Sequence, residues 1–224
     1  MLAELIDHLS DFVSKRRLEL FDKVLDYRTR YLNLVCEDIY QGHNASALLR
    51  TCECLGIQDI HILEARNNFE INSEIALGAS NWLTIQRHNR VNDTYAIFKE
   101  LRSKGCRIVA TTPHKQGVRL SEFDLEKGPA SIIFGTEKEG LSAELIKEAD
   151  EFITIDMYGF TESLNVSVSA GIILQYLRLK LMQSDIEWQL DQNERKMIKL
   201  DWLRKSIKRS DLIEKKFNNE NFCR

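Results

Sequence analysis

The sequence predicts an α/β protein with a parallel sheet and helices on both faces. Two observations lead to this fold class. Short runs rich in apolar and β-branched residues alternate with longer segments whose apolar residues recur every three or four positions. The short runs are also mostly continuously apolar, which is typical of strands that are buried on both sides of a sheet.

The elements follow one another regularly through the middle of the chain. The expected strands are 33–37 (NLVCE), 59–64 (DIHILE), 106–111 (CRIVAT), 130–135 (ASIIFG) and 151–156 (EFITID). The expected helices lie between and after them, at 44–56, 93–105, 142–150 and 165–182. One face of the last helix carries Val166, Ala170, Ile173, Leu177 and Leu181, so this face is expected to pack on the sheet.

Composition bounds the class of protein. A chain of 224 residues is long enough for one hydrophobic core with some appended segments. Its 43% hydrophobic and 29% charged residues, with only 10 Gly and 2 Pro, exclude collagen-like, low-complexity and disordered classes. The net charge of -3 gives no sign of a polyanionic partner, and by itself favours an enzyme that acts on a small molecule.

The N-terminal residues and the cysteines indicate a cytoplasmic protein. The chain begins MLAELIDHLSDFVSKRR, which lacks the order of a signal peptide, and no stretch reaches the roughly 20 apolar residues that span a bilayer. The 5 Cys are an odd number and are expected to be reduced thiols. On a helix, Cys52 and Cys54 would point about 200° apart, and no second pair completes a zinc site, so no metal is expected.

Two helical extensions, residues 1–30 and 183–224, flank the expected core of residues 31–182. Residues 31–175 hold 13 basic and 20 acidic side chains, whereas the stretch from Arg195 to Lys216 holds nine basic and three acidic ones. This stretch is expected to form a basic helix that packs through Ile198, Trp202, Leu203 and Ile207. Such a helix is either a solvated face or a surface for phosphates.

Three segments place polar residues or glycine where a strand gives way to a helix, the edge at which parallel sheets bind ligands. In the first, residues 42–56, Asn44 suits a helix N-cap and Gly56 suits a helix end. Arg50 lies among leucines, where a guanidinium needs an anionic or carbonyl partner. Spacing alone leaves a functional role and a structural salt bridge equally open for Arg50.

The second segment, residues 134–142 (FGTEKEGLS), has two glycines that allow close approach of the backbone to a ligand. It matches neither GxGxxG nor a phosphate loop, which removes the main support for a nucleotide site. Ser142 suits the cap of the next helix, whereas Glu137 has no such structural explanation.

The third segment, residues 156–165 (DMYGFTESLN), is long for an α/β connection, which favours ligand binding. Ser163 and Asn165 both suit the N-cap of the helix that follows.

Together these segments resemble the SpoU branch of the SPOUT RNA methyltransferases, and within it the tRNA (guanosine-2'-O-)methyltransferases. The three family motifs resemble HNASALLRTCECLGIQDIHIL, IIFGTEKEGLS and MYGFTESLNVSVSAGIIL, in that order. The similarity extends to GASNWLTIQRH and RLELFDKVLDYR, so it covers nearly the whole chain. One departure is Asp156 in place of a common proline before Met157, and Tyr158 and Phe160 replace smaller residues, which is expected to alter the cofactor pocket.

The resemblance implies a parallel sheet with a deep trefoil knot toward the C-terminal end of the core. It also implies a homodimer with a shared active site and S-adenosyl-L-methionine as the cofactor. The cofactor contacts implied by position are Thr111, Gly135, Ile155 and Leu164.

The implied catalytic residues are Arg50, Asn44, Glu137, Ser163 and Asn165. Arg50, oriented by Asn44, would approach the methyl group across the dimer interface. A guanidinium pKa above about 12 makes arginine a poor base. We therefore expect Arg50 to bind and orient the substrate, and to act as base only if it is deprotonated in the closed complex.

The implied substrate is a guanosine ribose in tRNA, in particular guanosine 18 of the D-loop. A 2'-hydroxyl can be methylated only where the ribose is exposed, so shape and phosphate contacts matter more than base reading. The RNA-binding residues expected in the C-terminal extension are Arg204, Lys205, Lys208 and Arg209. Those expected near the N-terminus are Arg16, Arg17 and Arg28.

Two other functions stay open. One is 2'-O-methylation of ribosomal RNA or of another tRNA position, such as the wobble nucleotide. The other is a catalytically silent RNA-binding member of the family, which is disfavoured because all five implied catalytic residues are present.

Overall fold

The computed structural model describes residues 1–64, 66–88, 93–113, 117–136 and 139–222, with the backbone alone at 93–94 and 220–222. The chain divides into two compact units. The core unit spans Thr29–Trp188, and the terminal unit combines Met1–Arg28 with Gln189–Arg224. The two ends of the chain thus belong to one unit.

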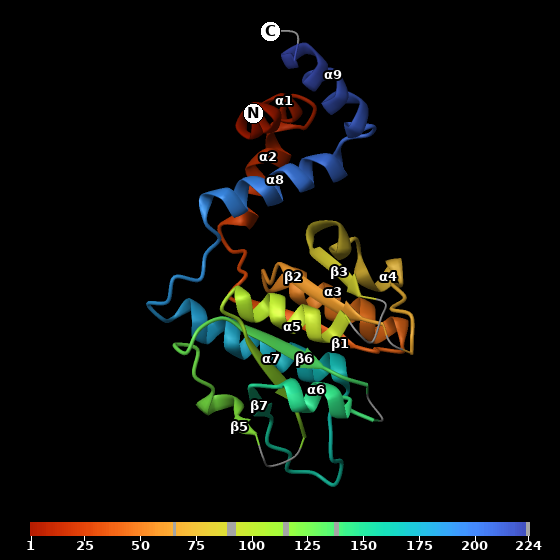
Figure 1. The fold of residues 1–224 in the computed structure, drawn as a ribbon, viewed down its shortest axis with the longest axis vertical. Coiled ribbons are helices and arrows are strands. Elements are labelled where there is room, and N and C mark those ends of the chain that lie inside the picture. The colour runs from red at the N-terminus through yellow and green to blue at the C-terminus, as the bar shows by residue number, and fades with distance from the viewer. Residues whose placement is uncertain (65, 89–92, 114–116, 137–138, 223–224) are drawn as a thin grey trace. The chain divides into compact units, whose positions relative to one another are not determined.

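The core unit is built on a parallel sheet of seven strands in the order β3-β2-β1-β6-β4-β7-β5 (Figure 1). The strands are β1 (Leu32–Glu37), β2 (Asp59–Leu63), β3 (Thr84–His88), β4 (Arg107–Thr111), β5 (Val118–Arg119), β6 (Ala130–Phe134) and β7 (Glu151–Thr154). Because neighbouring strands run parallel, their carboxyl ends meet at one edge of the sheet.

Five of these strands confirm the sequence prediction to within two residues at each end. The other two, β3 and β5, were not predicted, and they are the edge strands of the sheet. β3 has the sequence TIQRH and is only half-buried, while β5 has two exposed residues. Neither carries the continuous apolar pattern that identifies a central strand.

Helices cover both faces of the sheet, as predicted. The helices α3 (Gly42–Cys54) and α7 (Val166–Met182) share one hydrophobic cluster with the strands, and α5 (Asp93–Ser103) and α6 (Ala143–Glu148) share another. All five residues expected on the packed face of α7 are buried. The short helices α4 (Ser73–Ala76), η1 (Ala79–Trp82) and η2 (Leu120–Glu122) lie in the connections.

A buried arginine ties α7 to the end of α3. Arg178 of α7 donates from Nε to the carbonyl oxygen of Leu55 at 3.1 Å, and its guanidinium carbon lies 3.9 Å from the centroid of the Trp188 ring. Burial lowers the pKa of Arg178 to about 10. The helix α3 ends at Cys54, and Gly56 terminates it as predicted, because its φ of 74° allows the closing hydrogen bond from Ile57 N to Cys52 O.

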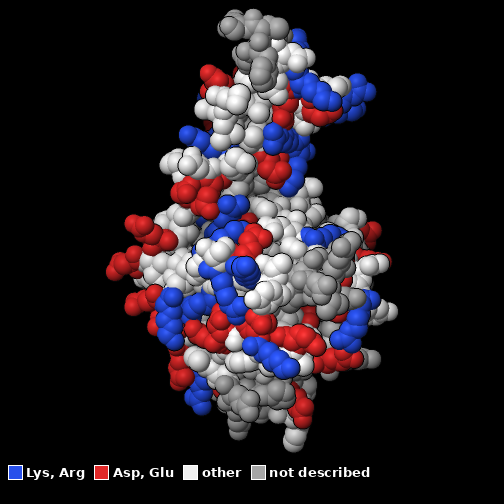
Figure 2. Space-filling model, in the orientation of Figure 1, with Lys and Arg blue, Asp and Glu red and all other residues white. Residues whose placement is uncertain are grey.

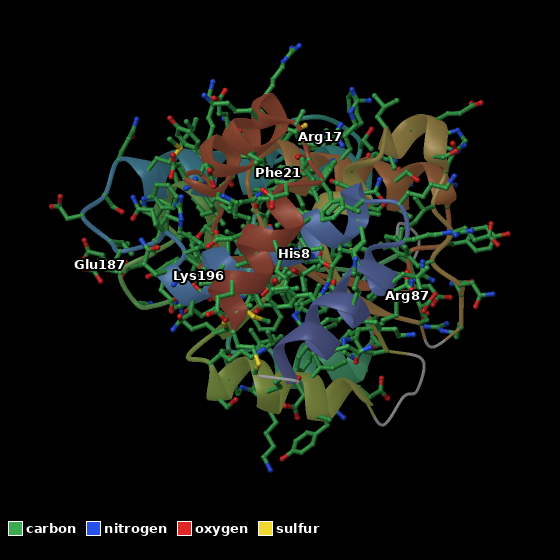
Figure 3. The ribbon with its side chains drawn as sticks, turned by 90° about the horizontal axis from the view of Figure 1, so that it is seen from above. His8, Arg17, Phe21, Arg87, Glu187 and Lys196 are labelled. Atoms are coloured by element: carbon green, nitrogen blue, oxygen red, sulfur yellow. The ribbon has the colours of Figure 1, made fainter. Side chains whose placement is uncertain are left out.

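The terminal unit consists of α1 (Leu2–Ser10), α2 (Lys15–Leu25), α8 (Gln192–Ser206) and α9 (Ser210–Phe222). Figure 3 shows the N-terminal helices, which carry His8 and Phe21, beside the C-terminal ones. The ring of Phe21 meets Trp202 edge-on at a centroid distance of 5.4 Å. Asp26 and Asp22 pair with Arg195 and Lys199 at 2.7 and 2.6 Å, so two cations of the basic stretch hold the unit together.

Two predictions about this unit are wrong. The basic stretch is two helices rather than one, because the chain turns between α8 and α9 with Arg209 at a φ of 61°. Arg28 is not available to bind RNA, because it is 0% exposed and its guanidinium carbon lies 5.4 Å from the Trp202 ring centroid.

One buried titratable pair lies between β2 and β3. His61 is buried, and its Nδ1 lies 3.4 Å from Nε2 of His88 in a stacked arrangement of the two rings. Burial, with help from the charge of His88, lowers the pKa of His61 to about 4. The folded protein therefore favours the neutral imidazole, whereas the unfolded chain binds a proton below its ordinary pKa of 6.5.

We predict that this pair makes the protein acid-labile. Stability is lost as the pH falls from about 6.5 to 4, and the loss attributable to His61 is about 2 kcal/mol at pH 5. The His61→Gln variant should show a smaller difference in unfolding free energy between pH 7.5 and pH 5, measured by urea denaturation. The exposed His43 serves as the control, and an equal pH dependence in His61→Gln and His43→Gln would contradict the prediction.

Candidate active site

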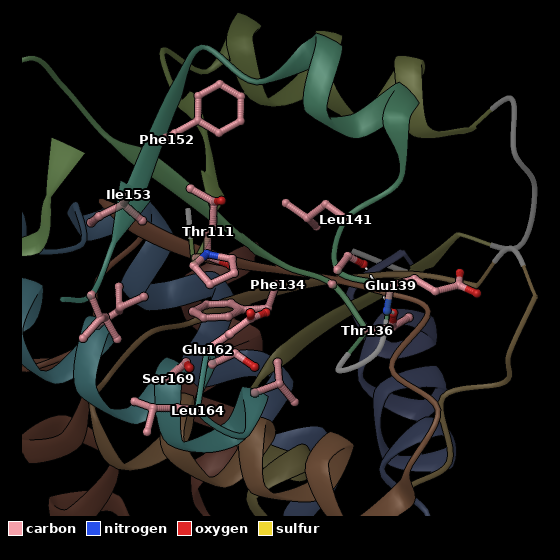
Figure 4. Close-up of a pocket in the computed structure, with 18 of the residues that line it drawn as sticks. Thr111, Phe134, Thr136, Glu139, Leu141, Phe152, Ile153, Glu162, Leu164 and Ser169 are labelled. Carbon is pink, nitrogen blue, oxygen red and sulfur yellow. Dashed lines mark hydrogen bonds between the residues drawn. The ribbon is translucent and has the colours of Figure 1, made fainter. Parts of the chain in front are cut away.

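A cavity of about 440 Å³ opens at the carboxyl ends of three neighbouring strands, β6, β4 and β7 (Figure 4). Its walls come from residues 111–113 after β4, from the Phe134–Ser142 loop after β6, and from the Asp156–Asn165 loop after β7. The lining residues include Thr111, Phe134, Gly135, Thr136, Glu139, Leu141, Ile153, Ile155, Met157, Glu162, Ser163, Leu164 and Ser169. The structure thus brings all four predicted cofactor residues, Thr111, Gly135, Ile155 and Leu164, to one cavity.

The Phe134–Ser142 loop folds back tightly on itself. Thr136 N donates to Gly140 O at 3.0 Å, and Gly140 N donates back to Thr136 O at 3.1 Å. A Cβ atom on Gly135 would lie 2.3 Å from Gly140 O, closer than any real contact. Gly140 has a φ of 70°. Both glycines are therefore required by the shape of this wall of the cavity.

A carboxylate from β1 anchors this loop. Glu37 accepts a hydrogen bond at Oε2 from the backbone N–H of Ser142 at 2.8 Å, and burial raises the pKa of Glu37. Ser142 caps α6 as predicted, accepting at Oγ from Leu145 N. Sequence reasoning missed Glu37, although an acidic residue that ends an apolar strand is a signal for the ligand-binding edge.

An arginine outside the loop pairs with Glu139 of the cavity wall. Arg66 donates to Glu139 of the cavity wall at 2.8 Å and lies 3.5 Å from Asp38. Asp38 in turn accepts from the backbone N–H of Arg66 at 2.8 Å. Its φ of 50° is unusual for a residue other than glycine, and such strain is concentrated at functional edges. None of these three residues was predicted.

The start of α7 is joined to α3 by a pair of asparagines. Asn165 caps α7 by accepting at Oδ1 from Ser167 N, and its Nδ2 donates to Oδ1 of Asn44 at 3.2 Å. Asn44 is buried, and it lies in the first turn of α3 because the N-cap is Gln41, so its predicted capping role is wrong. The structure brings Asn44 and Asn165 together, while Ser163 lies on the cavity wall.

Arg50 has surroundings different from those predicted. It lies on the exposed side of α3, not among the buried leucines. Within the described part of the chain it has no hydrogen bond or ion pair, so a structural salt bridge does not account for it. Glu137 lies outside the described residues.

Tyr158 and Phe160 do not enter the cavity, contrary to the prediction that they alter the cofactor pocket. Their relative exposures are 93% and 109%, and neither belongs to the cavity wall. Asp156, which stands where the family often has proline, pairs with Arg119 of β5 at 3.7 Å.

Apart from the buried Arg28, the predicted RNA-binding residues are exposed on the terminal unit. Arg204 forms a two-point pair with Glu214 at 2.7 and 2.8 Å, and Lys205 pairs with Asp201 at 2.6 Å. Lys and Arg side chains gather near the turn between α8 and α9 in Figure 2. This turn holds Lys208 and Arg209, while Arg16 and Arg17 lie at the start of α2.

The described ranges contain neither a metal-binding cluster nor a membrane-spanning helix. No three His, Cys, Asp or Glu side chains there are arranged to hold a metal ion. No helix of those ranges has the length and hydropathy needed to cross a membrane.

A parallel α/β sheet with a ligand cavity at its carboxyl edge, walled by the motif segments, defines a class of ligand-binding α/β enzymes. The profile of the SpoU rRNA Methylase family matches residues 31–175. The chain belongs to this family.

Known relatives extend the match beyond the core. The chain is 38% identical over 211 residues to the tRNA (guanosine(18)-2'-O)-methyltransferase of Borreliella burgdorferi, covering 94% of this chain and 95% of the relative. The structure resembles the TrmH/SpoU tRNA modifying enzyme of A. aeolicus, with a TM-score of 0.76, 30% identity and coverage of 87% and 98%. It also resembles an AdoMet-bound rRNA methyltransferase of Sinorhizobium meliloti, with a TM-score of 0.59, 25% identity and coverage of 70% and 60%.

We predict that Gly135→Ala collapses the cavity wall. The added methyl group would meet Gly140 O at 2.3 Å and would break the two hydrogen bonds that close the loop. We expect binding of S-adenosylmethionine, measured by calorimetry, to weaken at least about tenfold, with a stability loss of about 1–3 kcal/mol. Gly171→Ala on α7 is the control, because a Cβ there meets no atom within 4 Å. Equal binding by the two variants would contradict the prediction.

Proposed function

We propose that this protein transfers the methyl group of S-adenosylmethionine to the 2'-oxygen of guanosine 18 in tRNA. The observation that carries the proposal is the match to the Borreliella enzyme over 94% of this chain and 95% of the relative. That match includes the terminal unit as well as the core. The rRNA methyltransferase of Sinorhizobium, in contrast, is covered over only 60% of its chain.

The cavity suits S-adenosylmethionine in size and chemistry. Its volume of about 440 Å³ is in the range of small-molecule sites, and its walls combine apolar side chains with hydroxyl groups. Glu139 and Glu162 place two carboxylates on the wall, which suits a ligand with a positive sulfonium centre. Thr111, Gly135, Ile155 and Leu164 would hold the cofactor, and it supplies an electrophilic methyl group.

The protein has to hold a ribose hydroxyl in line with that methyl group. Arg50 is exposed and its planar guanidinium can bind a phosphate or ribose oxygen with two parallel hydrogen bonds. Asn44 and Asn165, hydrogen-bonded at 3.2 Å, link the start of α3 to the start of α7. Ser163 would contact the substrate from the cavity wall, and Glu137 would complete the catalytic site.

We further infer a homodimer in which Arg50 serves the partner's cavity. The support is an apolar stripe along the exposed side of α7. Val168, Ile172, Tyr176, Leu179 and Met182 recur every three or four residues and are each between 39% and 48% exposed. A stripe of this kind on a helix is the mark of an interface. Arg50 lies on α3, the helix that packs beside α7.

The proposal also includes a knotted chain and a location in the cytoplasm. The Phe134–Ser142 loop and the Asp156–Asn165 loop, which form the knot in this family, both wall the cavity here. We infer the same threading for this chain. A tRNA substrate would place the protein in the cytoplasm.

Contact with tRNA is assigned to the terminal unit. Lys208 and Arg209 at the turn between α8 and α9, with Arg16 and Arg17 on α2, are exposed cations suited to phosphates. Lys205 and Arg204 would join them, although each already has a carboxylate partner.

We predict that the purified protein forms one 2'-O-methylguanosine per tRNA at position 18. A tRNA transcript and labelled S-adenosylmethionine are incubated with the protein, and the digested nucleosides are identified by mass spectrometry. A transcript with 2'-deoxyguanosine at position 18 should accept no methyl group. Methylation of ribosomal RNA instead, or of neither RNA, would favour one of the two alternative functions.

The same methyl-transfer assay tests the role of Arg50 with the variant Arg50→Lys, which keeps the positive charge but loses the planar guanidinium. We expect kcat to fall about 100-fold while binding of S-adenosylmethionine stays unchanged. Full turnover by Arg50→Lys at neutral pH would contradict a specific role for the guanidinium.

We predict that the combined variant Lys205→Gln, Lys208→Gln and Arg209→Gln binds tRNA more weakly and with a flatter salt dependence. The slope of log K against log salt should fall by about 2 to 3 if all three cations contact phosphates. Binding is measured by anisotropy between 50 and about 200 mM salt. The control replaces Lys99, Lys127 and Lys147 of the core unit by Gln, an equal change of charge. Equal slopes for the two triple variants would indicate that the basic stretch is a solvated face that does not contact the RNA.

A further inference from the structure

Two aromatic side chains stand free beside the candidate active site. Tyr158 is 93% exposed and Phe160 is 109% exposed. Aromatic side chains have large apolar faces, and exposing them to water is unfavourable in proportion to that area. Two such rings, separated only by Gly159, indicate a surface that is covered when the protein works.

The two rings belong to a loop whose other residues line the cavity. Met157 on one side of them, and Glu162, Ser163 and Leu164 on the other, all line the cavity wall. Tyr158 and Phe160 do not. The Asp156–Asn165 loop therefore directs part of its residues to the cofactor site and these two rings outward beside it.

The charges of this loop disfavour a phosphate as the partner of the rings. The loop itself contains Asp156 and Glu162 and no lysine or arginine. The nearest cation that the structure pairs with it is Arg119, which lies 3.7 Å from the Asp156 carboxylate. An acidic loop repels the RNA backbone, whereas the face of an aromatic ring binds the uncharged face of a base.

The proposed reaction leaves a base in need of such a partner. The proposed target, guanosine 18, lies in a loop of the tRNA, and the bases of a loop can be splayed out so that they lose their stacking neighbours. Stacking on an aromatic side chain replaces those contacts without reading the sequence.

We propose that Tyr158 and Phe160 form a stacking surface for an unpaired base of the substrate RNA, at or next to the methylated nucleotide. The proposal rests on the proposed function and deepens it. Substrate selection would then come in part from two rings of the catalytic loop, in addition to the cations of the terminal unit.

The test compares RNA binding by ring-deleting and ring-keeping variants of the full chain. Fluorescence anisotropy with labelled tRNA gives the affinity of Tyr158→Ala, Phe160→Ala, Tyr158→Phe and Phe160→Tyr. Each alanine variant should bind about five- to 150-fold more weakly, which is the range of stacking on one base, and each ring-keeping variant should bind within about twofold of the unaltered protein. Tyr95→Ala, which removes a 65% exposed ring from α5, is the control and should have no effect.

A second RNA set identifies the base. Transcripts that lack the base, but keep the ribose, at position 18 or at either neighbour are bound by the same variants. If the rings stack on one of these bases, the unaltered protein binds the transcript that lacks this base more weakly than it binds intact tRNA. The alanine variants already lack the stacking contact, so removal of the same base weakens their binding little further.

Three results would overturn the proposal. The alanine variants could bind tRNA with the same affinity as the unaltered protein. Alternatively, their loss of affinity relative to the unaltered protein could be equal on every abasic transcript. Their loss could also accompany a change in oligomeric state by light scattering or in S-adenosylmethionine affinity by calorimetry, which would make the rings subunit or cofactor contacts. Because binding needs no methyl transfer, absence of 2'-O-methylguanosine would contradict the proposed function without deciding the stacking result.

Discussion

The parallel direction of the strands is the constraint on which the candidate site depends. β6, β4 and β7 are neighbours and run the same way, so the segments that follow them all begin at one edge. No one of these segments could enclose a ligand, because each contributes only one wall of the cavity. The cavity exists because register and direction bring three connections together that are distant in sequence.

Two long-range side-chain contacts then give these connections a fixed shape. Glu37 at the end of β1 holds the backbone of Ser142, and Asn44 at the start of α3 holds Asn165. Both anchoring residues belong to β1 and to the helix that follows it. β1 lies in the middle of the sheet, between β2 and β6, where the structure is most fully buried. β1 and the first family motif therefore support the other two motifs, and the first motif also provides Arg50.

The sequence predicted those parts of the fold whose information is local. Continuous apolar runs identify central strands, so β1, β2, β4, β6 and β7 were found, while the half-exposed edge strands β3 and β5 were not. The turn between α8 and α9 was missed because polar and apolar spacing continues through it. The extended backbone of Ile207 and the left-handed backbone of Arg209 end the helix there.

The candidate site shows the same division. The family resemblance predicted the contacts Thr111, Gly135, Ile155 and Leu164, which the structure brings to one cavity, but tertiary contacts decided where individual charges lie. Arg28 is buried beside Trp202, and Arg50 is exposed, each opposite to its predicted surroundings. A side chain's neighbours on other elements decide such burial, and spacing along one helix does not record them.

The distribution of charge indicates that affinity for RNA and selection of the nucleotide need different kinds of contact. Residues 31–175, which include the cavity, carry 20 acidic and 13 basic side chains, so this region repels a polyanion as a whole. Cations on the terminal helices can supply affinity for phosphates, but they carry no information about which ribose is presented. Under the proposed function, discrimination at the cavity would come from contacts that an acidic surface tolerates: hydrogen bonds to the ribose and the faces of aromatic rings. An acidic core unit joined to basic helices would then separate holding the RNA from choosing the nucleotide.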